Sequence, residues 1–132
     1  MIGLDTNILV RYFTHDDPGQ TPKALRLINE QLDSHRPGYI SIATLAELVW
    51  VLRTRYAADK ATVIGIVDHL LADPRFVTQH RDALWAALDT FERLPVDFGD
   101  ALIAMLDRAA GCSETLTFDR RAARIDGVRH LS

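Results

Sequence analysis

The feature that most constrains the fold of this chain is an alternation of short apolar runs with longer segments of helical periodicity. We expect strands at Met1–Leu4, Tyr39–Ile40, Glu114–Phe118 and Val128–Leu131. Met1–Leu4 is short and wholly apolar, so we expect it to be a buried, central strand, and we expect Glu114–Phe118 to be buried as well. Phe76–Thr78 fits either an edge strand or an extended loop. The connecting segments are long enough for crossovers, so the sequence predicts an α/β domain of three layers, with a mainly parallel central sheet flanked by helices.

Start and stop signals bound the helical segments. Pro22 lies in an expected first turn, Ser41 and Asp59 can cap helix N-termini, and Gly111 can end a helix in the left-handed conformation. The expected helices begin near Ile8 and then cover Thr21 to Leu32, Ser41 to Arg55, Lys60 to Ala72, Arg81 to Leu94 and Asp97 to Ala110.

Length, charge and cysteine content exclude several classes of protein. The 132 residues suit one domain, which we expect to span residues 1–132. The net charge of −3 argues against a uniformly basic nucleic-acid coat. Cys112 is the only cysteine, which excludes an internal disulfide and a cysteine-based zinc site. The apolar segments are too short for a membrane span, and the first residues are unlike a signal peptide, so we expect a cytoplasmic protein.

Four carboxylates stand out by position among the 18 acidic residues. Asp5 and Asp119 follow directly on expected strands, and ligand sites of open parallel sheets lie at such strand ends. Glu47 is the only charge in the apolar stretch Ser41–Trp50, and Asp100 lies near the start of an expected helix. Four like charges at one sheet edge would repel one another, and Mg²⁺ or Mn²⁺ resolves that conflict with oxygen ligands. The combination predicts metal-assisted hydrolysis of a phosphodiester.

Each carboxylate also has a purely structural interpretation. Asp5 and Asp119 can cap the helices that follow them, and Glu47 can point to solvent from an otherwise buried helix. Asp97 and Asp100 are three residues apart, and acidic residues in a first turn are favoured by the helix dipole.

The same segments resemble the motifs of a known family. In chain order, Met1–Arg11, Ile40–Leu48, Asp97–Ala104 and Leu116–Asp119 resemble the four motifs of PIN-domain ribonucleases of the VapC toxin type. The resemblance covers nearly the whole chain and implies a PIN-like fold.

The resemblance also implies an acidic quartet that binds Mg²⁺, with Mn²⁺ as a substitute, formed by Asp5, Glu47, Asp100 and Asp119. Asp5 and Asp100 are the expected direct ligands, and Asn7 and Thr117 match the polar residues that support such a site. Asp97 can share the cation or take the place of Asp119. The quartet is compatible with one ion or two.

An activity and three partners follow from the resemblance. It implies an endoribonuclease that is the toxin of a type II toxin-antitoxin pair, acts on RNA and forms a homodimer. A VapB-type antitoxin would block it through a hydrophobic groove between the N-terminal helices. The residues alone also allow a non-catalytic regulator that binds RNA or protein. A phosphatase-like enzyme fits less well, because Asp5-Thr6-Asn7 lacks the second Asp of an aspartyl-phosphate enzyme.

Basic and aromatic residues are candidates for contacts with RNA. Arg120, Arg121 and Arg124 follow directly on Asp119, where they can grip RNA phosphates or form ordinary solvated surface. Aromatic side chains can stack on bases, but single aromatics at helical spacing are more often part of the core or of an interface, and core is the default. We therefore expect the core to contain Tyr39, Trp50, Tyr56, Trp85 and Phe91.

Overall fold

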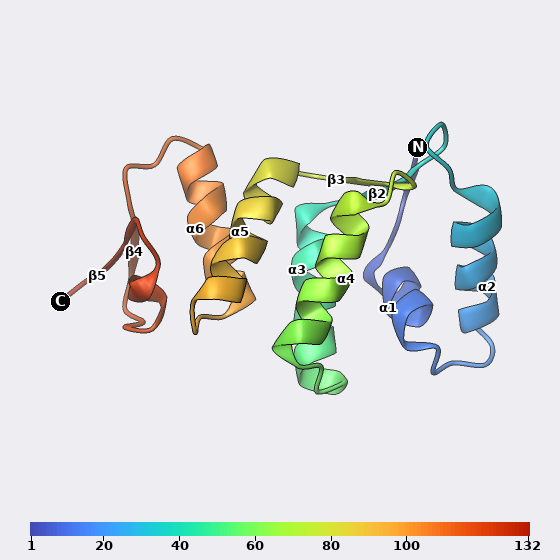
Figure 1. The fold of residues 1–132 in the computed structure, drawn as a ribbon, viewed down its shortest axis with the longest axis horizontal. Coiled ribbons are helices and arrows are strands. Elements are labelled where there is room, and N and C mark those ends of the chain that lie inside the picture. The colour runs from blue at the N-terminus through green and yellow to red at the C-terminus, as the bar shows by residue number, and fades with distance from the viewer. The chain divides into compact units, whose positions relative to one another are not determined.

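A computed structural model describes residues 1–132, which divide into two compact units, Met1–Gln79 and His80–Ser132 (Figure 1). The first unit contains β1 (Ile2–Gly3), α1 (Thr6–Thr14), α2 (Thr21–Arg26), a π-helical turn (Leu27–Gln31), β2 (Gly38–Ile40), α3 (Ile42–Arg55), α4 (Lys60–Ala72) and β3 (Phe76–Thr78). The second unit contains α5 (Arg81–Arg93), α6 (Phe98–Ala109), β4 (Thr115–Thr117), a 3-10 turn (Ala122–Arg124) and β5 (Val128–His130). No helix has the length and apolar character that crossing a membrane requires.

The strands of the first unit form a parallel sheet in the order β1-β2-β3. Ile2 pairs with Gly38, and Gly38 pairs in turn with Phe76, which places β2 in the middle. The backbone N–H of Leu4 continues this ladder by donating to the Tyr39 carbonyl at 2.9 Å. Phe76–Thr78 is thus a strand at one edge of the sheet, and the parallel pairing confirms the predicted α/β class.

The expectation that Met1–Leu4 forms a buried, central strand is wrong for this sheet. β1 is only two residues long and pairs with β2 alone, so Ile2 stays 37% exposed. Only Leu4, just beyond the strand, is buried, and a Cβ at Gly38 would lie 2.6 Å from its Cδ1 atom. The apolar run therefore anchors the chain through Leu4 immediately before Asp5.

Local capping signals set the helix starts of the first unit. Ser41 Oγ accepts a hydrogen bond from the Thr44 N–H at 3.2 Å, and an Asp59 carboxylate oxygen accepts from the Thr62 N–H at 2.8 Å. The predicted helix from Thr21 to Leu32 instead widens into the π-helical turn, where the Leu32 N–H donates to the Leu27 carbonyl. Helix α1 packs against both α2 and α3. Fully buried apolar side chains of this unit include Leu9, Ile28, Ile40, Leu45, Leu48, Leu52, Val63, Val67 and Leu70.

A guanidinium network ties β3 to the N-terminal helices of this unit. Arg75 forms an ion pair with Asp73 at 2.7 Å. It also donates to the Asn29 side-chain oxygen at 3.0 Å and to the Tyr12 hydroxyl at 3.3 Å. Both charged side chains are mostly buried, with 25% of Arg75 and 11% of Asp73 exposed, so this pair is screened less than a surface pair.

The second unit consists of a helical hairpin followed by two parallel strands. Helices α5 and α6 pack extensively, and Phe91 meets Phe98 edge-to-face with ring centroids 5.7 Å apart. Gly111, with φ of 95°, ends α6 as predicted. β4 pairs with β5, with Leu116 opposite Arg129.

The expectation of a buried strand at Glu114–Phe118 is wrong in this structure. Leu116 is 49% exposed and Phe118 is 79% exposed. A pair of short strands covers little of either face, and alternation along β4 points Leu116 outward while Thr115 and Thr117 are half-buried.

Candidate active site

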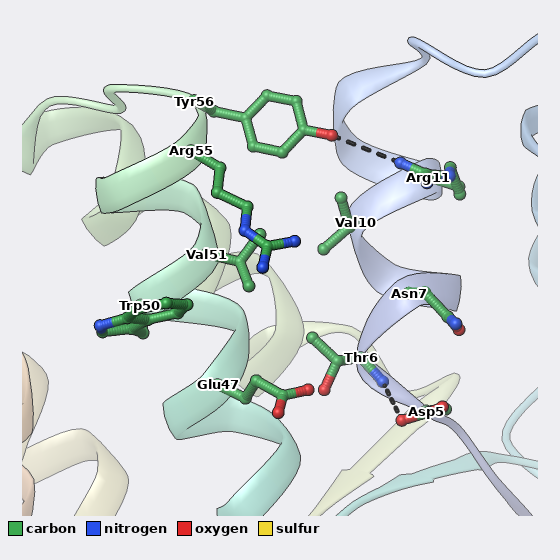
Figure 2. Close-up of a pocket in the computed structure, with 10 residues that line it drawn as sticks. All are labelled: Asp5, Thr6, Asn7, Val10, Arg11, Glu47, Trp50, Val51, Arg55 and Tyr56. Carbon is green, nitrogen blue, oxygen red and sulfur yellow. Dashed lines mark hydrogen bonds between the residues drawn. The ribbon is translucent and has the colours of Figure 1, made fainter.

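Asp5 and Glu47 line the same pocket of the first unit. Asp5 immediately precedes α1, and its extended backbone and carboxylate cap that helix by accepting from the Thr6 N–H at 2.8 Å. Glu47 projects from the second turn of α3, on the side facing α1 (Figure 2). Both line an open pocket of about 310 Å³ and a smaller neighbouring one of about 200 Å³. The two carboxylates therefore share a solvent-accessible space.

Asp5 caps α1, as its structural interpretation predicted, and it also lines the pocket, so the capping role leaves the carboxylate accessible there. Glu47 is solvent-exposed, as its structural interpretation predicted, yet it faces the pocket and forms no ion pair. Asn7, from the first turn of α1, lines the larger pocket as well. This end of the pocket therefore contains several side-chain oxygen atoms that could act as metal ligands and that form no ion pair with a basic residue.

The opposite end of the pocket is cationic and aromatic. Tyr56 donates a hydrogen bond to Asp16 at 2.6 Å and accepts one from Arg11 at 3.3 Å, which joins the ends of α1 and α3. Arg55 extends from the last turn of α3 into the pocket (Figure 2). Its guanidinium lies 6.0 Å from the centre of the Trp50 ring.

The expectation that Trp50 belongs to the core is wrong. Trp50 is 57% exposed and lines the pocket, whereas Phe91 is 2% exposed and is a core residue as predicted. Trp50 follows the buried pair Leu48 and Val49 on α3, and the helical turn carries it to the pocket side. Arg55 is a further pocket residue that no motif in the sequence singled out. Its spacing of eight residues from Glu47, two helical turns on, is a signal that could have identified it.

The second unit brings together Asp97, Asp100 and Asp119. Asp100 lies half-buried in the first turn of α6. Burial raises the pKa of its carboxyl group, repulsion from Asp97 and then Asp119 raises it further, and the Arg121 charge opposes the shift. The three carboxylates are therefore close enough for Asp97 and Asp119 to affect the ionisation of Asp100, as expected for a site that attracts a cation.

Asp97 does not cap α6 with its side chain, although it occupies the N-cap position. Its carboxylate instead lies 4.0 Å from the Arg121 guanidinium. Asp119 does act as a cap, because its carboxylate accepts from the Arg121 N–H at 2.8 Å and the Ala122 N–H at 3.3 Å. Thr117 Oγ1 accepts from the Asp119 N–H at 3.0 Å, so this hydroxyl fixes the turn that carries Asp119.

The three arginines after Asp119 differ in their surroundings. Arg121 lies 4.0 Å from the Asp97 carboxylate and donates to the Pro95 carbonyl at 2.7 Å. Arg120 is exposed, and Arg124 lines a separate pocket of about 300 Å³.

The donor chemistry of both acidic groups suits a hard divalent cation. No group of three or more His, Cys, Asp or Glu side chains is arranged to hold a metal ion by itself. Mg²⁺ is commonly bound through one or two carboxylates, with water and substrate phosphate as the other ligands. Asp5 with Glu47 in one unit, and Asp100 with its acidic neighbours in the other, fit that requirement.

Comparison with known protein families assigns nearly the whole chain to one family. The PIN domain family matches residues 2–128, which is almost the whole chain. No curated protein matches the sequence. PIN domains are generally nucleases that act on RNA or other nucleic acid and use divalent metal ions. The six helices and parallel strands agree with the three-layer α/β fold of that family. This chain belongs to the PIN domain family.

Proposed function

We propose that this protein is a Mg²⁺-dependent endoribonuclease and the VapC-type toxin of a type II toxin-antitoxin pair. The proposal rests on the resemblance of these carboxylate positions to the family's motifs, and the observation that carries it is that the carboxylates are grouped within each unit. Asp5 and Glu47 share a pocket, and Asp100 has a raised pKa beside Asp97 and Asp119. Glu47 caps no helix, and it lines the pocket without a cationic partner.

The proposed roles follow from the resemblance to the family's motifs, and the surroundings of the residues support some of them. Asp5 and Asp100 are the metal ligands, while Glu47 and Asp119 orient or deprotonate the attacking water. When bound, Mg²⁺ supplies Lewis-acid stabilisation of phosphate charge and lowers the pKa of a coordinated water. Two backbone N–H groups fix the Asp119 carboxylate, and Thr117 supports it from the preceding strand. Glu47 is exposed and lines the pocket, so a water molecule in the pocket can reach its carboxylate.

The proposed antitoxin site is a groove beside the acidic end of the first unit. A pocket of about 360 Å³ lies between α1 and α2, and its lining residues are Asn7, Ile8, Arg11, Gln20, Lys23, Ala24 and Leu27. Apolar walls with a polar rim suit an amphipathic helix of a VapB-type antitoxin. We further propose that the toxin is a cytoplasmic homodimer and that residues 1–132 act as one nuclease domain.

A specific observation also favours a second candidate function, that of a non-catalytic regulator that binds RNA or protein. The Asp5 and Asp119 carboxylates both accept backbone hydrogen bonds at helix starts, which is a sufficient structural role for each. The regulator differs from the nuclease in predicting neither RNA cleavage nor binding of divalent ions.

Digestion of total RNA separates the two functions. We expect antitoxin-free protein to release discrete fragments with Mg²⁺ or Mn²⁺ and none with EDTA. Asp5→Asn should abolish cleavage, whereas Asp68→Asn, which changes an exposed acid on α4, should cleave like the wild type. Intact RNA with folded wild-type protein, together with no divalent-ion effect on its melting temperature, would favour the regulator.

A further inference from the structure

The pocket of the first unit carries a charge pattern beyond the acidic residues. Its acidic end holds Asp5 and Glu47, and Arg11 and Arg55 lie toward its other end (Figure 2). The exposed Trp50 lies between Glu47 and Arg55 along α3. A uniformly acidic site would attract only cations. A site with acids at one end and a cation beside an aromatic ring at the other suits a ligand that carries phosphate and a flat base.

The two arginines of the pocket differ in how far their charge is neutralised. Arg11 lies 3.3 Å from Asp16 and 3.7 Å from Asp17, and it also donates to Gln20 at 2.8 Å. Arg55 forms no ion pair, and its contact is with the Trp50 ring. Arg55 is therefore the pocket cation with an uncompensated charge for an incoming anion.

The spacing along α3 relates this cation to the acidic end. Glu47, Val51 and Arg55 are four residues apart in sequence, so they lie along one face of the helix. The α-carbons of Glu47 and Arg55 are separated along the helix axis by about 12 Å. Stacked nucleotides of one strand rise by roughly 3.4 Å each, so the pocket spans a few nucleotides.

We propose that Trp50 and Arg55 bind a nucleotide of single-stranded RNA close to the phosphate that is cleaved. The base stacks on the exposed face of Trp50, and Arg55 pairs with a backbone phosphate. Single-stranded RNA is favoured because a base paired in a duplex cannot offer its face to a side chain. The position of the cleaved phosphate beside Asp5 and Glu47 rests on the proposed nuclease function, whereas the binding itself does not.

The test measures RNA binding without catalysis, using the full chain in EDTA. A fluorescein-labelled RNA of eight uridines is titrated by anisotropy. In a Trp85→Phe background, Trp50 is the only tryptophan, so its fluorescence reports stacking directly. We expect the RNA to quench this fluorescence, and an RNA duplex of equal length to compete weakly.

The variants separate stacking from charge. Trp50→Ala should weaken binding roughly tenfold or more, and Trp50→Phe should recover most of that loss. Arg55→Gln should weaken binding and lower the slope of log K against log salt by about 0.7. Arg26→Gln, which changes an exposed arginine on α2, is the matched control and should have a smaller effect on both quantities.

Two results would overturn the inference: no quenching on addition of RNA, or equal binding by the wild type, Trp50→Ala and Arg55→Gln. Binding of an acidic peptide in preference to the RNA would also overturn it, because the pocket would then serve a protein partner. The outcome is independent of nuclease activity. If the wild type cleaves RNA but Trp50→Ala and Arg55→Gln bind RNA as well as the wild type does, only this inference is wrong. If these variants weaken binding but the wild type cleaves no RNA, only the proposed nuclease function is wrong.

Discussion

Replacing Gly38 by alanine should destabilise the strand that positions Asp5. A Cβ at Gly38 would lie 2.6 Å from Leu4 Cδ1 and 3.0 Å from Leu32 Cδ1. Leu4 is 5% exposed and Leu32 is 4% exposed, so neither side chain can swing into solvent to make room. Overpacking of this kind costs about 1–3 kcal/mol, and we expect Gly38→Ala to lower the free energy of unfolding by that amount.

Urea unfolding followed by circular dichroism would measure the effect, with the slope m unchanged. Leu4→Val removes the closest atom, so the loss caused by Gly38→Ala should shrink in a Leu4→Val background. This non-additivity distinguishes a clash from a general loss of strand stability. If Gly38→Ala unfolds at the wild-type urea concentration, or if the two substitutions are additive, the close packing inferred around Leu4 is wrong.

Two further predictions concern charged groups. Asp100 has a raised pKa in the folded protein, so its ionisation opposes folding, and this cost appears as the pH rises through that pKa. Asp100→Asn should therefore raise the free energy of unfolding at pH 7, with a gain that fades below pH 3.8, and a gain that grows on acidification would contradict the assignment. Arg75 lowers the pKa of Asp73, so their interaction stabilises the protein at neutral pH and is lost as the pH falls. Asp73→Asn should cost about 1–2 kcal/mol in urea unfolding at pH 7, and an unchanged midpoint would show that the pair contributes nothing net.

The parts of the fold that depend on local chemistry could be predicted from the sequence. Ser41 and Asp59 cap helices as expected, and Gly111 ends α6, because a cap needs only the residues of its own turn. Strand burial was predicted less well. Ile2 and Leu116 are exposed, because burial depends on what covers each strand rather than on its own composition.

In the candidate site, too, features set by local sequence could be predicted and features set by tertiary packing could not. Motif positions located Asp5 and Glu47, and the structure places both at one pocket. The sequence could not show that Trp50 faces that pocket, since an aromatic residue at helical spacing fits either a core or a surface. The position of Asp97 at the start of α6 suggested a capping role as one interpretation. Its ion-pair partner is instead Arg121, which lies 24 positions further along the chain. Such contacts are set by tertiary packing.

The central claim is that these carboxylates hold a divalent ion needed to hydrolyse RNA. Its most direct test is the single-turnover rate of cleavage of one 5′-labelled RNA as a function of Mg²⁺ concentration, for the wild type and Asp100→Asn. We expect a rate that saturates with Mg²⁺ and is zero in EDTA, and a loss of roughly 100-fold or more in Asp100→Asn, although that variant is folded. A rate that is independent of Mg²⁺, or full activity of Asp100→Asn, would contradict it.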